Sequence, residues 1–121
     1  MAKHILVVDD SVSIRQMVEV TLLSANYQVS LAKDGKEAFD MCRINTYNFV
    51  LTDQNMPRMD GITLIKSLRS LPAYQRIPII MLTTEAGHEM KLKGKDAGAT
   101  GWMVKPFNPA KLLELTAKVL G

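Results

Sequence analysis

Acidic, hydroxyl and ammonium side chains each come at the end of a short apolar run in this sequence. Asp9 and Asp10 follow the first run, Asp53 follows the third, Thr83 closes the fourth, and Lys105 follows the last. Three carboxylates that lie together repel one another unless a cation joins them, and a hard, oxygen-liganded ion such as Mg²⁺ suits such a set. A lysine and a hydroxyl beside that ion can contact an oxyanion. The set therefore indicates phosphoryl transfer to Asp53, chemistry that needs positioning and charge neutralisation more than a strong base.

Five short apolar runs are predicted to be β-strands. The continuous apolar character of the first, third and fourth runs indicates burial on both faces, as in a parallel sheet. The predicted strands are Ile5–Val8, Val29–Ala32, Phe49–Thr52, Ile79–Thr83 and Gly101–Val104.

Helical patterns separate the strands, with apolar residues at helical spacing. We expect helices at about Ser13–Ala25, at Lys36–Arg43, at a segment marked by Gly61, Leu64, Ile65 and Leu68, at Glu85–Ala97, and at a last segment that Asn108 caps and Pro109 opens. Five βα repeats predict an α/β fold with an open, doubly wound sheet. Ligands of such sheets bind at the carboxyl ends of the strands, where all the polar residues named first are expected to meet.

The bulk composition is that of an ordinary globular protein. The 121 residues are the size of one domain, so we expect a single domain over residues 1–121. The apolar runs are too short for a membrane span, and no secretory signal is visible. A single cysteine, Cys42, favours a cytoplasmic location. The net charge of +3 is weak evidence for nucleic acid, which we do not expect as a partner. The last helix ends at the terminus, so we expect no attached output domain.

Three other functions are less compatible with the same residues. A phosphatase with an aspartate nucleophile needs a second acid two residues after that nucleophile, but Ser11 follows Asp9 at this spacing and Asn55 follows Asp53. A flavin-binding protein needs a hydroxyl- and glycine-rich loop after the first strand, where Asp10 would repel a phosphate. A pure interaction module needs none of the acids, the hydroxyl or the lysine, yet all are present.

Nearly the whole chain resembles the CheY-like receiver domains of two-component signalling. The motifs that carry the resemblance are Leu6-Val7-Val8-Asp9-Asp10-Ser11, Asp53-Gln54-Asn55-Met56-Pro57, Met59-Asp60-Gly61, Leu82-Thr83-Thr84-Glu85, Gly98-Ala99-Thr100-Gly101-Trp102 and Lys105-Pro106-Phe107. The resemblance implies a flavodoxin-like sheet with strand order 2-1-3-4-5 and a cis peptide bond between Lys105 and Pro106.

The resemblance also implies a role for each matching residue. Asp53 is expected to be the phosphoacceptor, with Thr83 and Lys105 contacting the phosphoryl group. Mg²⁺, or Mn²⁺ in its place, is expected to bind the carboxylates of Asp10 and Asp53, the backbone carbonyl of Asn55 and, through water, Asp9. The expected switch residues are Thr83, Trp102, Lys105 and Pro106.

Two of these residues keep more than one interpretation. Trp102 is either the aromatic switch residue or only a large side chain on an edge strand. Glu85 is either a helix-start charge favoured by the helix dipole or, together with Asn55, a residue that tunes dephosphorylation.

The implied function is a stand-alone, monomeric response regulator of chemotaxis. We expect a signalling protein, not an enzyme, that assists its own phosphorylation and dephosphorylation. Its expected partners are a histidine kinase of the chemotaxis type and a flagellar motor switch or another target at the face formed by helix four, strand five and helix five. The alternative is a phosphate sink or phosphorelay intermediate in another pathway. Helix four departs from its relatives by carrying Lys91, Lys93 and Lys95, which favours an acidic target.

Overall fold

The computed structural model describes residues 2–84 and 87–120, over which strands and helices alternate. In chain order the elements are β1 (His4–Val8), α1 (Val12–Ser24), β2 (Gln28–Ala32), α2 (Gly35–Ile44), β3 (Phe49–Asp53), α3 (Gly61–Arg69), the short 3₁₀ helix η1 (Pro72–Tyr74), β4 (Ile79–Thr83), α4 (His88–Ala97), β5 (Gly101–Val104) and α5 (Pro109–Leu120). No helix in these ranges is both long enough and apolar enough to cross a bilayer.

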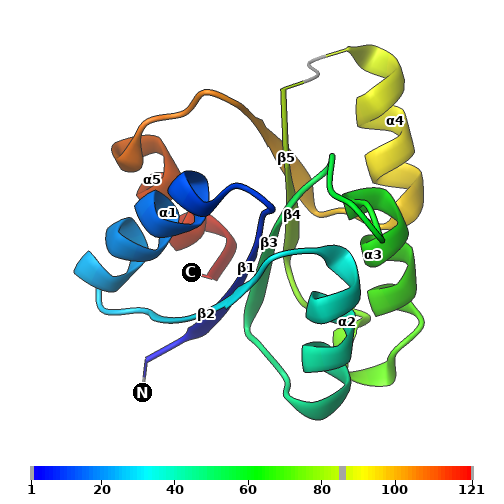
Figure 1. Cartoon of the computed structure of the whole chain (residues 1–121), viewed down its shortest axis with the longest axis horizontal. Helices are drawn as coiled ribbons and strands as arrows, with labels where there is room; N and C mark the ends of the chain where they lie inside the picture. Colours follow the sequence, from blue (N-terminus) through cyan, green and yellow to red (C-terminus); the bar gives the residue numbers. More distant parts are fainter. Residues whose placement is uncertain (1, 85–86, 121) are drawn as a thin grey trace.

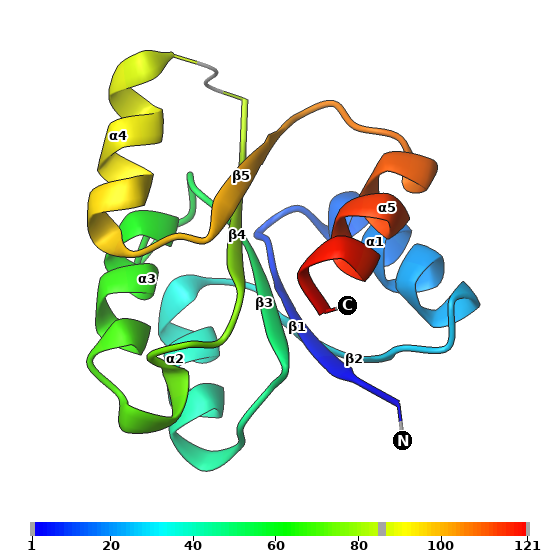
Figure 2. The same ribbon diagram turned by 180° about the vertical axis from the view of Figure 1, so that it is seen from behind.

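The five strands form one parallel sheet in the order β2-β1-β3-β4-β5, which confirms the expected topology. Helices α1 and α5 cover one face of the sheet and α2, α3 and α4 cover the other, as Figure 1 and the reverse view in Figure 2 show. Strand order reverses between β1 and β3, and this is where ligands of doubly wound sheets bind.

The sheet is buried on both faces because each central strand carries a continuous apolar run. On β1, the side chains of Leu6 and Val8 pack with α2 and α3, whereas those of Ile5 and Val7 pack with α1 and α5. All five residues of β3 and of β4 are buried, while β2 at the edge is only partly so. The two cores hold the strand ends in a fixed register, and the site is built on those ends.

Side chains ahead of the helices fix where several of them begin. The side-chain oxygens of Ser11, Asp34 and Asp60 each accept a hydrogen bond from the backbone amide three residues further on, and Asn108 does the same ahead of α5. The prediction that Asn108 caps the last helix is therefore confirmed. Asp60 caps α3 immediately after the loop that leaves β3.

The predicted start of α4 is wrong. The sequence pattern placed it at Glu85, which lies outside the described residues, but the helix begins at His88 because Gly87 before it has an extended backbone with ψ of 149°. The boundaries of the first two helices differ from the prediction by one residue at each end. β4 and β5 have the predicted bounds, and β3 extends one residue further, to Asp53.

Candidate functional site

Three carboxylates meet at the carboxyl edge of the sheet. The pairing of Val8 with Thr52 places the ends of β1 and β3 side by side, so Asp9 and Asp53 become neighbours. One carboxylate oxygen from each of Asp9, Asp10 and Asp53 lies within 4.8 Å of the others. Asp9 is fully buried and Asp53 is nearly so, whereas Asp10 is exposed. The cluster therefore opens to solvent on the side of Asp10.

Lys105 is the cation of this cluster. Its Nζ atom lies 2.9 Å from Oδ2 of Asp9 and 3.1 Å from Oδ1 of Asp53. The backbone holds it there, because the Lys105 amide donates a hydrogen bond to the carbonyl oxygen of Thr83 at 2.8 Å. The Lys105-Pro106 peptide bond is cis, as the resemblance implied. The lysine reaches the cluster from the far end of the chain and bridges two of its three carboxylates.

The pKa values of Asp53 and Lys105 are both raised, but for different physical reasons. Burial, followed by the charge of Asp9, raises the pKa of the Asp53 carboxyl above its ordinary value, although Lys105 opposes the shift. Burial alone would lower the pKa of Lys105, but the hydrogen bond to Asp9 and the charges of both carboxylates raise it overall. Lys105 thus remains an ammonium at neutral pH.

A backbone donor holds the carboxylate of Asp9, and a side-chain donor holds its backbone carbonyl. Oδ1 of Asp9 accepts a hydrogen bond from the Ser11 amide at 2.9 Å, and the Asp9 carbonyl oxygen accepts one from Nη1 of Arg15 at 2.6 Å. The sequence pattern did not single out Arg15. A signal was available, because an arginine in the first turn of a helix opposes the helix dipole and so needs another partner.

The loop after β3 is fixed by Gln54, a second residue that the pattern missed. Its amide donates to Oδ1 of Asp53 at 2.9 Å, and its carbonyl accepts from the amide of Gly61. Its side-chain oxygen accepts from the amide of Ile62 at 2.9 Å. Asn55 is next in the chain and is exposed. No local sequence signal marks Gln54, because its role depends on α3 folding back onto the strand end.

Thr83 lies at the same edge as the carboxylates. It is the last residue of β4, is almost fully buried, and pairs in register with Val104, next to Lys105. The predicted residues Asp9, Asp10, Asp53, Thr83 and Lys105 are therefore brought together by four strand ends. Glu85 lies outside the described residues.

The donor set fits a hard divalent cation. Three carboxylates with one lysine leave an excess of negative charge in a partly buried position, and oxygen atoms are the ligands that Mg²⁺ and Mn²⁺ accept. Neither a sulfur nor an imidazole nitrogen belongs to the cluster, so a zinc site has no support here.

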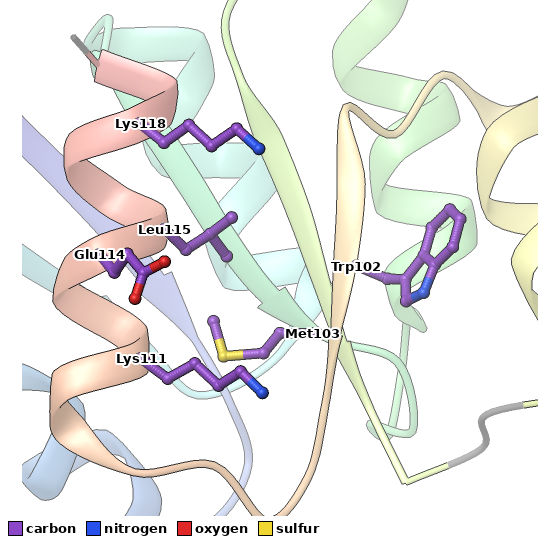
Figure 3. Close-up of a pocket in the computed structure, with 6 residues that line it drawn as sticks. All are labelled: Trp102, Met103, Lys111, Glu114, Leu115 and Lys118. Atoms are coloured by element: carbon purple, nitrogen blue, oxygen red, sulfur yellow. The ribbon is translucent and has the colours of Figure 1, made fainter.

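Trp102 lies away from the cluster, on the outer strand β5, and its side chain is partly exposed. Figure 3 shows its indole on the side of β5 opposite to Met103, whose side chain points toward α5. Nζ of Lys91 lies 5.3 Å from the centroid of the Trp102 ring, within the range of a cation–π contact. Trp102 also borders a hollow of about 200 Å³ between β5 and α5, which is lined by the apolar side chains of Met103 and Leu115 and by Lys111 and Lys118.

The fold and the site define an open α/β protein with an acidic, metal-compatible site at the carboxyl edge of its sheet, next to the point where strand order reverses. The chain belongs to the response regulator receiver domain family, which it matches over residues 5–117. It is 42% identical over 119 residues to the chemotaxis protein CheY1 of Helicobacter pylori, covering 97% of this chain and 96% of that protein. It is also 42% identical over 102 residues to a gliding motility regulatory protein of Myxococcus xanthus, but these residues span only 13% of that larger protein.

Solved structures agree with this membership. Chemotaxis protein CheY4 of Vibrio cholerae is 47% identical and superposes with a TM-score of 0.96, covering 99% of this chain and all of that one. The receiver domain of the sensor histidine kinase PA1611 from Pseudomonas aeruginosa, 29% identical with a TM-score of 0.93 and covering 100% and 99% of the two chains, is described with magnesium coordinated in its active-site cleft.

Proposed function

We propose that the chain is a single-domain response regulator of chemotaxis that is switched by phosphorylation of Asp53. The observation that carries the proposal is the contact of Lys105 with both Asp9 and Asp53 at the open carboxyl edge of the sheet. Its support from relatives is the near full-length similarity to chemotaxis regulators of two bacteria. These relatives do not favour the alternative of a phosphate sink or phosphorelay intermediate.

The carboxylate of Asp53 is the proposed nucleophile. Oδ1 accepts hydrogen bonds from Lys105 and from the Gln54 amide, so Oδ2 is the oxygen from which an O–P bond can form as the P–N bond of a phosphohistidine donor breaks. The ammonium group of Lys105 then stabilises the negative charge of the phosphoryl oxygens. The buried Thr83 hydroxyl at the same edge is proposed to bind the phosphoryl group as well.

A divalent cation completes this proposal. Asp10, Asp53 and the backbone carbonyl of Asn55 are the proposed direct ligands of Mg²⁺ or Mn²⁺, and Asp9 is proposed to act through water. The ion supplies charge neutralisation between the carboxylates and the phosphoryl oxygens. Asn55 and Glu85 are the proposed residues that tune dephosphorylation, so the protein would assist both the gain and the loss of its own phosphoryl group.

The output surface is proposed to be formed by α4, β5 and α5. The proposed switch begins at the phosphoryl group, which Thr83 and Lys105 contact. Their change of position is proposed to reach Trp102 on β5, and Pro106, the residue after Lys105, is part of the same switch. The hollow beside Trp102 is bordered by Lys111 and Lys118 and contains one acid, Glu114, so an acidic, partly apolar segment of a target complements it. The proposed partner is a flagellar motor switch protein or another target with such a segment. The protein itself is proposed to be a monomer in the cytoplasm.

Phosphotransfer tests the kinase assignment. The protein is mixed with an autophosphorylated histidine kinase of the chemotaxis type and, separately, with one of another class. We expect rapid, Mg²⁺-dependent transfer to Asp53 from the first kinase only. Equal transfer from both kinases, without a phosphorylation-dependent gain in affinity for an acidic target peptide, would favour the phosphate sink instead.

A further inference from the structure

Arg58 stands at a backbone position where arginine is unfavourable. It lies in the loop between β3 and α3, and its φ is 68°. The Met59 amide donates a hydrogen bond to the Pro57 carbonyl at 2.8 Å, which makes Arg58 the centre of a three-residue turn with a positive φ. Such turns are rare and strained for residues with a side chain, at a cost of roughly 1–3 kcal/mol. A glycine would relieve the strain, so the presence of arginine indicates that its side chain makes a compensating interaction.

That side chain is bound to the N-terminus of α2. Nε of Arg58 lies 3.1 Å from Oδ2 of Asp34, and Nη2 lies 3.4 Å from Oδ1. Two guanidinium nitrogens thus face two carboxylate oxygens, an arrangement that fixes direction as well as distance. The Asp34 side chain is only 5% exposed, whereas that of Arg58 is 59% exposed, so the carboxylate is enclosed by protein and solvent reaches the pair from the arginine side.

Asp34 is itself a rigid anchor. Its Oδ1 accepts a hydrogen bond from the Glu37 amide at 2.8 Å and so caps α2. The next residue, Gly35, touches the loop: a Cβ atom placed there would overlap the carbonyl oxygen of Met59. The start of α2 and the Arg58 turn are therefore in direct contact, and the ion pair closes one side of that contact.

The same loop carries the proposed carbonyl ligand of the metal ion. Asn55 lies between Gln54, which is fixed to Asp53 and α3, and the Arg58 turn, which is fixed to α2. We propose that Arg58 and Asp34 form a positioning pair that holds the loop after β3 in the conformation in which its backbone can coordinate the cation. This inference rests on the proposed metal site, because the pair touches no carboxylate of the cluster and acts only through the loop.

The affinity for a divalent cation tests the pair. Binding of Mn²⁺ to the full chain is measured from the electron paramagnetic resonance signal of free Mn²⁺, with Mg²⁺ as competitor. Arg58→Gln keeps the backbone strain and removes the charge, while Asp34→Asn keeps a good helix cap and removes the charge. We expect each change to weaken Mn²⁺ binding about three- to tenfold, at or below the low end of the effect seen for outer-shell partners of metal ligands.

Coupling and rescue separate positioning from general destabilisation. The double variant is expected to have the same Mn²⁺ affinity as whichever single variant binds more weakly. The reason is that Arg58→Gln and Asp34→Asn each remove the same interaction. Arg58→Lys is expected to recover part of the affinity. The matched control is Lys36→Met, which breaks the exposed ion pair with Asp40 on the same helix and should leave Mn²⁺ affinity unchanged. Parent-like affinity in folded Arg58→Gln and Asp34→Asn, or additive losses in the double variant, would overturn the proposal.

Arg58→Gly provides a variant that folds readily, since glycine accepts the positive φ without strain. It is expected to melt at or above the temperature of the parent and still to bind Mn²⁺ more weakly. A folded Arg58→Gly protein with parent affinity would contradict the positioning role. Failure of the parent itself to bind Mn²⁺ would contradict the proposed function instead, so the two failures are distinguishable.

Discussion

The ammonium group of Lys105 lies 2.9 Å from a carboxylate oxygen of Asp9, although 96 positions separate the two residues in the chain. Asp9 is fully buried, and an ionised carboxylate in that position requires a positive partner. Lys105 supplies that charge and also contacts Asp53. One side chain therefore stabilises the folded protein and lies where the charge of a phosphoryl group would develop.

Replacement of Lys105 by methionine should destabilise the protein because it leaves Asp9 and Asp53 without their shared cation. The expected loss is on the order of 3 kcal/mol in the free energy of unfolding, measured by urea denaturation without divalent ions. Added Mg²⁺ should raise the melting temperature of Lys105→Met more than that of the parent, since the ion replaces the missing charge. An equal Mg²⁺ effect in both proteins would contradict this view.

Replacement of Asp53 by asparagine should stabilise the protein at neutral pH. Burial and the charge of Asp9 raise the pKa of Asp53 in the folded state above its unfolded value, so its contribution to stability is present at acidic pH and is lost as the pH rises through the raised pKa. Asp53→Asn should therefore melt a few degrees higher than the parent at pH 7, with the difference shrinking toward pH 3.

The control for this experiment is Asp40→Asn. Asp40 is exposed, and its hydrogen bond to Lys36 lowers its pKa, so the same change there should not stabilise the protein. A lower melting temperature for Asp53→Asn than for the parent at pH 7 would show that the Asp53 charge is favourable to the fold.

Removal of the Lys91 ammonium should alter the environment of Trp102. Lys91→Met keeps most of the aliphatic stem but loses the cation–π contact, which contributes about 0.5–1 kcal/mol at exposed sites. Because Trp102 is the only tryptophan in the sequence, its emission maximum and its quenching by iodide report the change directly. Lys93→Met is the matched control, since Lys93 pairs with Glu89. Identical spectra for the two variants would show that Lys91 does not contact the indole in solution.

Gly61 allows α3 to begin directly against Asp53 at the end of β3. A Cβ atom there would lie 2.5 Å from the Asp53 carbonyl oxygen and 3.0 Å from Cα of Gln54. Gly61→Ala should cost about 1–3 kcal/mol in stability and slow phosphorylation, because the strand end must shift. Gly87→Ala serves as the control, since among the described residues, its chain neighbours apart, no atom lies within 4 Å of a Cβ built there. Equal stability and phosphorylation rates in the two variants would contradict the close approach.

The sequence was sufficient to predict the sheet and most of the site for one physical reason. Buried parallel strands are continuous apolar runs, and in a parallel sheet all their carboxyl ends lie at one edge. Asp9, Asp53 and Lys105 each follow such a run, so the pattern alone predicts that they lie close together. The cis bond at Lys105 and the strand order came from family resemblance, since neither follows from residue patterns.

Other features depend on contacts that no local pattern encodes. Arg15 binds the Asp9 carbonyl, and Arg58, in the loop after β3, binds Asp34 at the start of α2. The early start predicted for α4 failed because Gly87 adopts an extended backbone. Helix propensity also does not reveal the close approach of α4 to β4, where a Cβ atom at Gly94 would lie 3.0 Å from the terminal methyl group of Met81.

Mass spectrometry of the intact protein shows whether Asp53 accepts a phosphoryl group with the help of a divalent cation. The parent is incubated with a small phosphodonor such as acetyl phosphate, with Mg²⁺ or with a chelator, beside Asp53→Asn. We predict the mass increase of one phosphoryl group in the parent with Mg²⁺ only, and peptide mapping that places the group on Asp53. An equal mass increase in Asp53→Asn, or none in the parent with Mg²⁺, would show that Asp53 is not a Mg²⁺-dependent phosphoacceptor.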